Sequence, residues 1–108
     1  MTPITREDLE MAAKAAGLSI DRVNEGLLVT DPNSVSYGYF WAPDENDGDC
    51  ARMCAAVGID TEWGAARVDV YAGGVPVGVA WLVDHANDKC AAWRYAAVKL
   101  AAAVGRSM

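Results

Sequence analysis

The sequence predicts an α+β protein in which three helices pack on an antiparallel sheet of about four to five strands, an αβα-sandwich-like single domain. Three observations support this prediction. Three segments carry apolar residues at helical spacing, two segments around Gly73-Gly74 alternate with the period of a strand, and turn signals separate them. The chain has 108 residues, of which 53% are hydrophobic, so residues 1–108 can form one core but not two.

The first helix is predicted to begin after Thr5. Thr5 and Asp8 have the spacing of an N-cap residue and its partner in a near-capping box. The apolar face that follows is narrow and consists of Leu9, Ala12, Ala13 and Ala16. Gly17 comes directly afterwards, where a glycine commonly ends a helix.

The next part of the chain is predicted to form strands joined by turns. A short strand or an extended connection is expected to start at 18–20. Strands are expected at 27–30 and 35–41, and turns at 24–26 and 31–34. The last of these strands is rich in aromatic residues, which suit a sheet. Gly38 inside it indicates a bulge or the close approach of another backbone.

A second helix is predicted after the acidic loop formed by residues 44–49. Its buried stripe consists of Cys50, Met53, Cys54 and Val57, and Gly58 ends it. The loop does not have the spacing of a calcium-binding EF-hand, because Gly48 stands at the fifth position and Ala55 replaces the bidentate glutamate. The acidic residues are better explained as favourable neighbours of the positive end of a helix.

A hairpin and a third helix complete the predicted fold. Ala66, Val68 and Val70 face one side of a strand at 66–71, and Gly73-Gly74 turns into a second strand at 75–83, in which Pro76 suits only an edge. Asn87 or Asp88 is expected to cap a helix from about 89 to 104, ended by Gly105. The core face of this helix is predicted to consist of Trp93, Ala97, Leu100 and Val104.

Composition excludes several classes of function. The net charge is -6 and there is no basic run, so the sequence argues against nucleic-acid binding. No apolar run approaches the roughly 20 residues of a membrane helix. The first ten residues lack the basic and apolar regions of a signal peptide, which predicts a cytosolic protein.

The three cysteines are expected to be free, buried thiols. Cys50, Cys54 and Cys90 all fall in predicted helices of a cytosolic protein. A zinc site could be drawn from these cysteines and His85, but structural zinc sites usually take closely spaced cysteines from turns rather than from an apolar helix stripe. The sequence therefore assigns no metal and no cofactor.

Three features occur in order along the second half of the chain. They are an aromatic-x-Pro-x-x-x-Asp loop that enters a helix, an Asp-x-Cys that opens an Ala-rich helix bearing an Arg, and the ending Ala-Ala-Val-Gly-Arg-Ser-Met. The residues concerned are Trp41, Pro43, Asp47, Ala51, Asp88, Cys90, Ala92 and Arg94. With these features, roughly residues 36 to 108 resemble the phage ABA-sandwich domain family and the related NinX-type phage proteins. The resemblance implies a bacteriophage accessory protein in the cytoplasm of the infected bacterium, and it implies no activity.

The candidate ligand-binding residues surround the starts of the second and third helices. Exposed N–H groups at such helix starts can hold an anion such as phosphate, Arg52 and Arg94 lie in the first two turns, and aromatic residues could stack a base. The carboxylates of residues 44–49 oppose this interpretation. The full set of candidate residues is Trp41, Pro43, Asp47, Arg52, His85 and Arg94.

The sequence favours a non-enzymatic protein that acts by binding. We expect a nucleotide-like small molecule as the ligand, such as a nucleotide-derived host defence signal that a phage gains by sequestering. The alternative is an inhibitor or adaptor that binds a host protein through the acidic, aromatic-flanked loop at 41–49. No catalytic residue is assigned, because the single histidine, His85, has no identifiable nucleophile. The Ala-rich last helix would also suit packing in a homo-oligomer.

Overall fold

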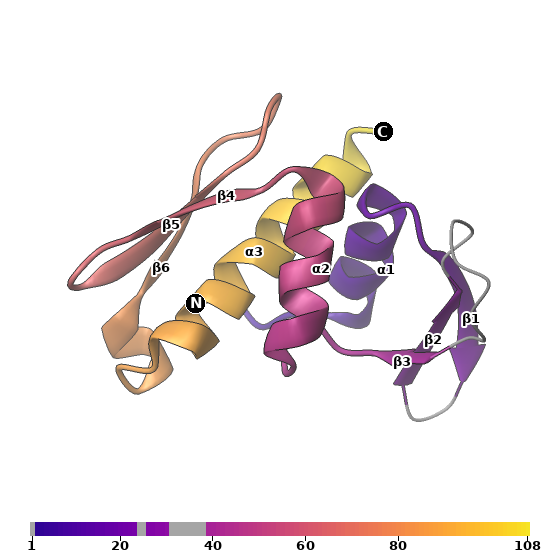
Figure 1. Cartoon of the computed structure of the whole chain (residues 1–108), viewed down its shortest axis with the longest axis horizontal. Helices are drawn as coiled ribbons and strands as arrows, with labels where there is room; N and C mark the ends of the chain where they lie inside the picture. The colour runs from indigo at the N-terminus through magenta and orange to yellow at the C-terminus, as the bar shows by residue number, and fades with distance from the viewer. Residues whose placement is uncertain (1, 24–25, 31–38) are drawn as a thin grey trace.

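A computed structural model describes residues 2–23, 26–30 and 39–108 and confirms the α+β class (Figure 1). Three helices form a central layer, and two three-stranded antiparallel sheets lie on either side of it. The sequence predicts one sheet of about four to five strands. The strands divide into two groups because helix α2 separates β3 from β4 along the chain and each group pairs only with its own hairpin neighbours.

Helix α1 (Arg6–Ala15) begins and ends where the sequence predicts. The Thr5 hydroxyl accepts a hydrogen bond from the backbone N–H of Asp8, and the Asp8 carboxylate accepts one from the backbone N–H of Thr5. This reciprocal pair satisfies two N–H groups that the first helical turn would leave without a partner. Gly17 follows the helix with φ 74°, a conformation that favours glycine.

The first sheet contains β1 (Ser19–Val23), β2 (Gly26–Thr30) and β3 (Tyr39–Trp41), in that order. All neighbours are antiparallel. Of the predicted turn at 24–26, Gly26 is the first residue of β2, and residues 24–25 lie outside the described residues. The same holds for the predicted turn at 31–34, the first part of the predicted strand at 35–41 and the expected irregularity at Gly38. Val29 and Trp41 are buried, so the sheet contributes side chains to the core.

Helix α2 (Asp47–Val57) follows the acidic loop, and Asn46 is its N-cap. The Asn46 side chain accepts a hydrogen bond of 2.9 Å from the backbone N–H of Asp49. The helix ends at Gly58 in a left-handed conformation, and the N–H groups of Gly58 and Ile59 both donate to the Cys54 carbonyl. The acidic loop therefore has the capping role that its sequence indicates.

The second sheet contains β4 (Asp60–Trp63), β5 (Arg67–Tyr71) and β6 (Gly78–Trp81). Strand β6 is shorter than the predicted strand at 75–83. Trp81 pairs with the first residue of β5, Arg67, so the chain has no further strand partner, and it turns instead into the 3-10 helix η1 (Leu82–His85). Pro76 lies outside the strand, as its missing N–H requires.

Helix α3 (Lys89–Arg106) is capped by Asp88 and packs against α1, α2, β5 and β6. Alanine residues make up most of its buried surface, which lets neighbouring elements approach closely. Trp93 and Val104 are only half-buried, although the sequence places both on the core face. Trp93 instead contacts Trp63 and donates to the Thr61 hydroxyl.

Gly105 was expected to end α3, but it lies inside the helix. A Cβ atom at this position would lie 2.0 Å from the carbonyl oxygen of Met11 in α1. Gly105 therefore allows α1 and α3 to pack closely where they cross, and it does not end the helix. A local sequence pattern cannot distinguish these two uses of glycine.

Candidate functional site

The corner between β3 and α2 is held together by hydrogen bonds within the chain. The Asp49 carboxylate accepts from the backbone N–H of Ala42 at 3.1 Å and also pairs with Arg52 at 2.6 Å. Trp41 and Pro43 are buried. These two predicted site residues therefore support the corner from inside and offer no surface to a ligand.

Arg94 connects α3 to the same corner. Its Nε–H donates to the backbone carbonyl of Asp44 at 3.1 Å, and its terminal nitrogen donates to the Asp47 carboxylate. This hydrogen bond to Asp47 raises the pKa of Arg94 above its usual value. The structure thus brings Asp47 and Arg94 together, as an ion pair rather than as an anion-binding pair.

Arg52 is the more exposed of the two arginines. Two-thirds of its side chain is accessible, although its guanidinium pairs with Asp49 three residues earlier in α2. An exposed pair of this kind stabilises a protein by about 0.2–1 kcal/mol, so Arg52 can leave it at little cost. Arg94, of whose side chain only 17% is exposed, is held more firmly.

An open groove of about 340 Å³ lies beside this corner and is the candidate site. Three separate parts of the chain line it, namely the N-terminal segment, the acidic loop, and the region from η1 to α3. The lining residues are Pro3, Ile4, Asp44, Glu45, His85, Ala91 and Tyr95. The rings of His85 and Tyr95 lie 5.0 Å apart and tilted by 47°, so each orients the other.

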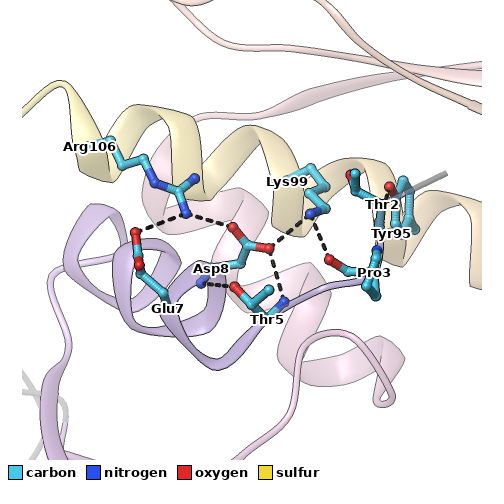
Figure 2. Close-up of polar contacts among 8 residues, drawn as sticks. All are labelled: Thr2, Pro3, Thr5, Glu7, Asp8, Tyr95, Lys99 and Arg106. Carbon is cyan, nitrogen blue, oxygen red and sulfur yellow. Dashed lines mark hydrogen bonds and ion pairs between the residues drawn. The ribbon is translucent and has the colours of Figure 1, made fainter.

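Side chains of α3 form hydrogen bonds with the N-terminal segment, which contributes Pro3 and Ile4 to the groove (Figure 2). The Tyr95 hydroxyl donates to the Thr2 carbonyl. Lys99 donates to the Pro3 carbonyl at 2.9 Å. The Pro3 and Ile4 part of the groove wall therefore depends on α3 as well as on its own segment.

The groove has an acidic character. Burial raises the pKa of the Asp44 carboxyl, and the neighbouring negative charge of Glu45 adds to this effect. No lysine or arginine is among the residues that line the groove. The groove combines two carboxylates, an imidazole and a phenol ring with an apolar wall. This lining suits a ligand that has a positively charged or hydrogen-bond-donating group attached to an apolar chain.

Of the six predicted site residues, only His85 lines the groove. Arg94 does not line the groove but donates a hydrogen bond to the carbonyl of Asp44, which does. Asp47 pairs with Arg94 and Arg52 pairs with Asp49, and neither Asp47 nor Arg52 lines the groove. Sequence reasoning singled out the loop that contains Asp44 and Glu45 but missed Tyr95, Pro3 and Ile4. No local pattern indicates that these residues meet, because they lie at opposite ends of the chain.

A polar cluster around Asp8 is a second feature that sequence reasoning missed (Figure 2). Asp8 is 4% exposed, and its carboxylate accepts hydrogen bonds of 2.8 Å from Lys99 and 2.7 Å from Arg106, both on α3. Burial alone would raise the pKa of Asp8, but the hydrogen bonds from Lys99, the Thr5 backbone and Arg106 together hold it well below its usual value. The sequence indicates Asp8 only as a partner of Thr5.

Two of the three cysteines are buried and one is exposed. Cys50 and Cys54 are buried, and the pKa of Cys50 is raised because its thiol hydrogen bonds to Cys54 and is removed from water. Cys90 is exposed, contrary to the expectation that all three are buried, because it lies on the solvent side of the first turn of α3. Among the described residues, no group of three or more potential ligands is arranged to hold a metal ion.

Comparison with known proteins finds no matching family model, curated protein or solved structure. The likeness to the phage ABA-sandwich family therefore rests on the quoted residues alone. In the part of the chain that the structure describes, no helix is long and apolar enough to cross a membrane.

Proposed function

We propose that this chain is a non-enzymatic bacteriophage accessory protein that acts in the host cytoplasm by binding a small organic cation in the groove beside the acidic loop. The groove itself is the observation that carries the proposal, since it joins three parts of the chain in one concave site. The phage origin and the location rest on the resemblance of residues 36–108.

A protonated amine with an apolar chain matches the chemistry of this groove. The Asp44 and Glu45 carboxylates can accept hydrogen bonds from an ammonium group, and such charge-assisted bonds are the stronger class. Binding a cation would also favour the ionised form of Asp44, whose pKa burial raises. Ile4, Ala91 and the Tyr95 ring supply apolar contact for the rest of the ligand.

The nucleotide-like ligand that the sequence suggests is the alternative. It would require Arg52 or Arg94 to leave its carboxylate partner and turn to a phosphate. The carboxylates of Asp44 and Glu45 would then lie near the anion and repel it. The exposed position of Arg52 is the one observation that favours this alternative, because its ion pair is weak.

The test is a titration of the protein with hexylamine and with adenosine monophosphate, followed by NMR. We expect hexylamine to shift the signals of His85 and Tyr95 with a Kd of about 1 mM, a usual strength for so small a ligand. The double variant Asp44→Asn/Glu45→Gln should weaken binding roughly tenfold, because it removes both carboxylate charges. Asp84→Asn is the matched control, since this exposed residue adjoins His85 but does not line the groove.

Two results would overturn the cation proposal. One is the absence of any shift at His85 or Tyr95 with hexylamine. The other is binding of adenosine monophosphate that survives the Asp44→Asn/Glu45→Gln change and is lost in Arg52→Gln. Mass spectrometry of compounds released on denaturing the protein, purified from bacteria with active nucleotide-signalling defences, would then identify the natural ligand.

A further inference from the structure

The β4-β5-β6 sheet has one face on the core and one face toward solvent. Val68, Val70 and Ala80 are buried on the side that packs against α3. Residues paired across the sheet lie on the same side of it, and adjacent residues of a strand lie on opposite sides. The register therefore places the following residues on the other side, here called the outer face: Asp60, Glu62, Arg67, Asp69, Tyr71, Val79 and Trp81.

The outer face exposes apolar and aromatic side chains. Trp81 is 49% exposed, Val79 41% and Tyr71 36%, and Val77, immediately before β6, is 50% exposed. Val79 and Trp81 belong to β6, and Val77 directly precedes this strand. Tyr71 lies on the same face, two residues beyond Asp69, the β5 partner of Val79, so these residues gather on one side of the sheet. A patch that contains a tryptophan and a tyrosine is typical of a surface that binds another protein.

The charges on the same face are mainly negative. The face carries three carboxylates, those of Asp60, Glu62 and Asp69. Arg67 is the single cation of the described face. The Tyr71 hydroxyl donates to Glu62. Arg67 lies over the Trp81 ring at 5.5 Å and has its Nε 3.2 Å from the Asp69 carboxylate.

Asp60 and Glu62 carry the negative charge of the outer face that Arg67 does not compensate. The Oδ1 atom of Asp69 lies 3.2 Å from Arg67 Nε, so these two residues form an ion pair, although Oδ1 accepts no hydrogen bond. Asp60 and Glu62 are exposed on β4. A cation brought by a partner would find favourable potential beside these two carboxylates.

We propose that the outer face is a docking surface for a segment of another protein that carries both basic and apolar side chains. Charge complementarity decides the occupant. Arg67 pairs with Asp69, so the carboxylates of Asp60 and Glu62 leave the face net negative and favour a partner with lysine or arginine residues beside its apolar ones. A second copy of this chain would bring the same negative face and a net charge of -6, so it is disfavoured. No residue of the outer face lines the groove, so this surface does not depend on the proposed cation site.

The proposal is tested with a short synthetic peptide that alternates lysine and valine, and with a matched peptide that alternates glutamate and valine. We expect the lysine peptide to shift the amide signals of β5 and β6 and the indole signal of Trp81. Val79→Ser/Trp81→Ser should weaken this binding about tenfold or more, since exposed aromatic residues often dominate such contacts. Phe40→Ser is the control, because Phe40 is an exposed aromatic of the other sheet.

Charge is tested separately with Asp60→Lys/Glu62→Lys, two exposed positions whose replacement leaves the core intact. This variant should no longer bind the lysine peptide and should bind the glutamate peptide more tightly than the wild type does. Equal binding of both peptides by the wild type, or shifts that map outside the β4-β5-β6 sheet, would overturn the proposal. Concentration-dependent dimerisation that Val79→Ser/Trp81→Ser abolishes would overturn it in favour of a second copy.

Discussion

At the scale of single residues, Gly105 and Asp8 define the contact between α1 and α3. Gly105 allows the backbones to meet, and Asp8 supplies a charge that two side chains of α3 neutralise. Neither residue has a large apolar side chain. The contact therefore depends on close approach and on polar pairing as much as on burial of apolar surface.

Gly105→Ala should destabilise the protein by about 3 kcal/mol, the upper end of the usual cost of overpacking. The new methyl group would overlap the Met11 carbonyl, and the backbone of α1 must move to relieve it. Alanine gains about 1 kcal/mol of helix propensity, which offsets only part of this cost. Chemical denaturation measures the change.

Gly48→Ala is the matched control, because Gly48 lies in α2 and its new methyl group would meet only side-chain atoms, the nearest 3.2 Å away. The Arg52 side chain can shift freely, and a small movement of Asn46 weakens only its cap hydrogen bond to Asp49, so we expect a loss of less than about 1 kcal/mol. A Gly105→Ala variant as stable as the wild type would show that the two helices are not held at this distance.

At the scale of elements, the ends of the helices could be predicted from sequence because the signals that set them are local. Thr5 with Asp8, Gly17 and Gly58 act within a few residues of their own helix, and the structure confirms all of them. Gly105 has the same local appearance, but a residue of another helix determines its role. The groove could not be predicted for the same reason, since Ile4, Asp44 and Tyr95 meet only through the tertiary fold.

The pairing of α1 with α3 through Asp8 predicts a loss of stability in acid. Because the pKa of Asp8 is lower in the folded state than in the unfolded state, its contribution is fully present above the unfolded pKa of about 4. The contribution is lost as the pH falls from there through the folded pKa. Asp8→Asn should therefore destabilise the protein by about 2 kcal/mol at pH 7 and weaken the acid dependence below about pH 4.

Denaturation of the wild type and Asp8→Asn across this pH range measures the effect. Glu7→Gln is the control, since Glu7 is exposed and pairs with the same Arg106 at 3.4 Å, and an exposed pair is worth less than about 1 kcal/mol. If the two variants lose the same stability at pH 7, burial of Asp8 does not strengthen its ion pairs.

At the scale of the whole molecule, the helical layer is what links the two sheets (Figure 1). Helix α3 packs against β5 and β6, α1 contacts β1, and the extensive contact between α1 and α3 connects the two halves. Val68 and Val70 of β5 are fully buried against this layer. A change confined to the α1–α3 contact should therefore affect the two sheets unequally.

Native-state hydrogen exchange of Gly105→Ala tests this arrangement. We expect the amides of α1, β1 and β2 to exchange faster than in the wild type, because the loosened α1 can open together with the sheet that it contacts. The amides of β5 should change less, since its valines remain packed on α3. Equal acceleration in both sheets would instead mean that the molecule opens only as a single cooperative unit, with the α1–α3 contact as an inseparable part of one core.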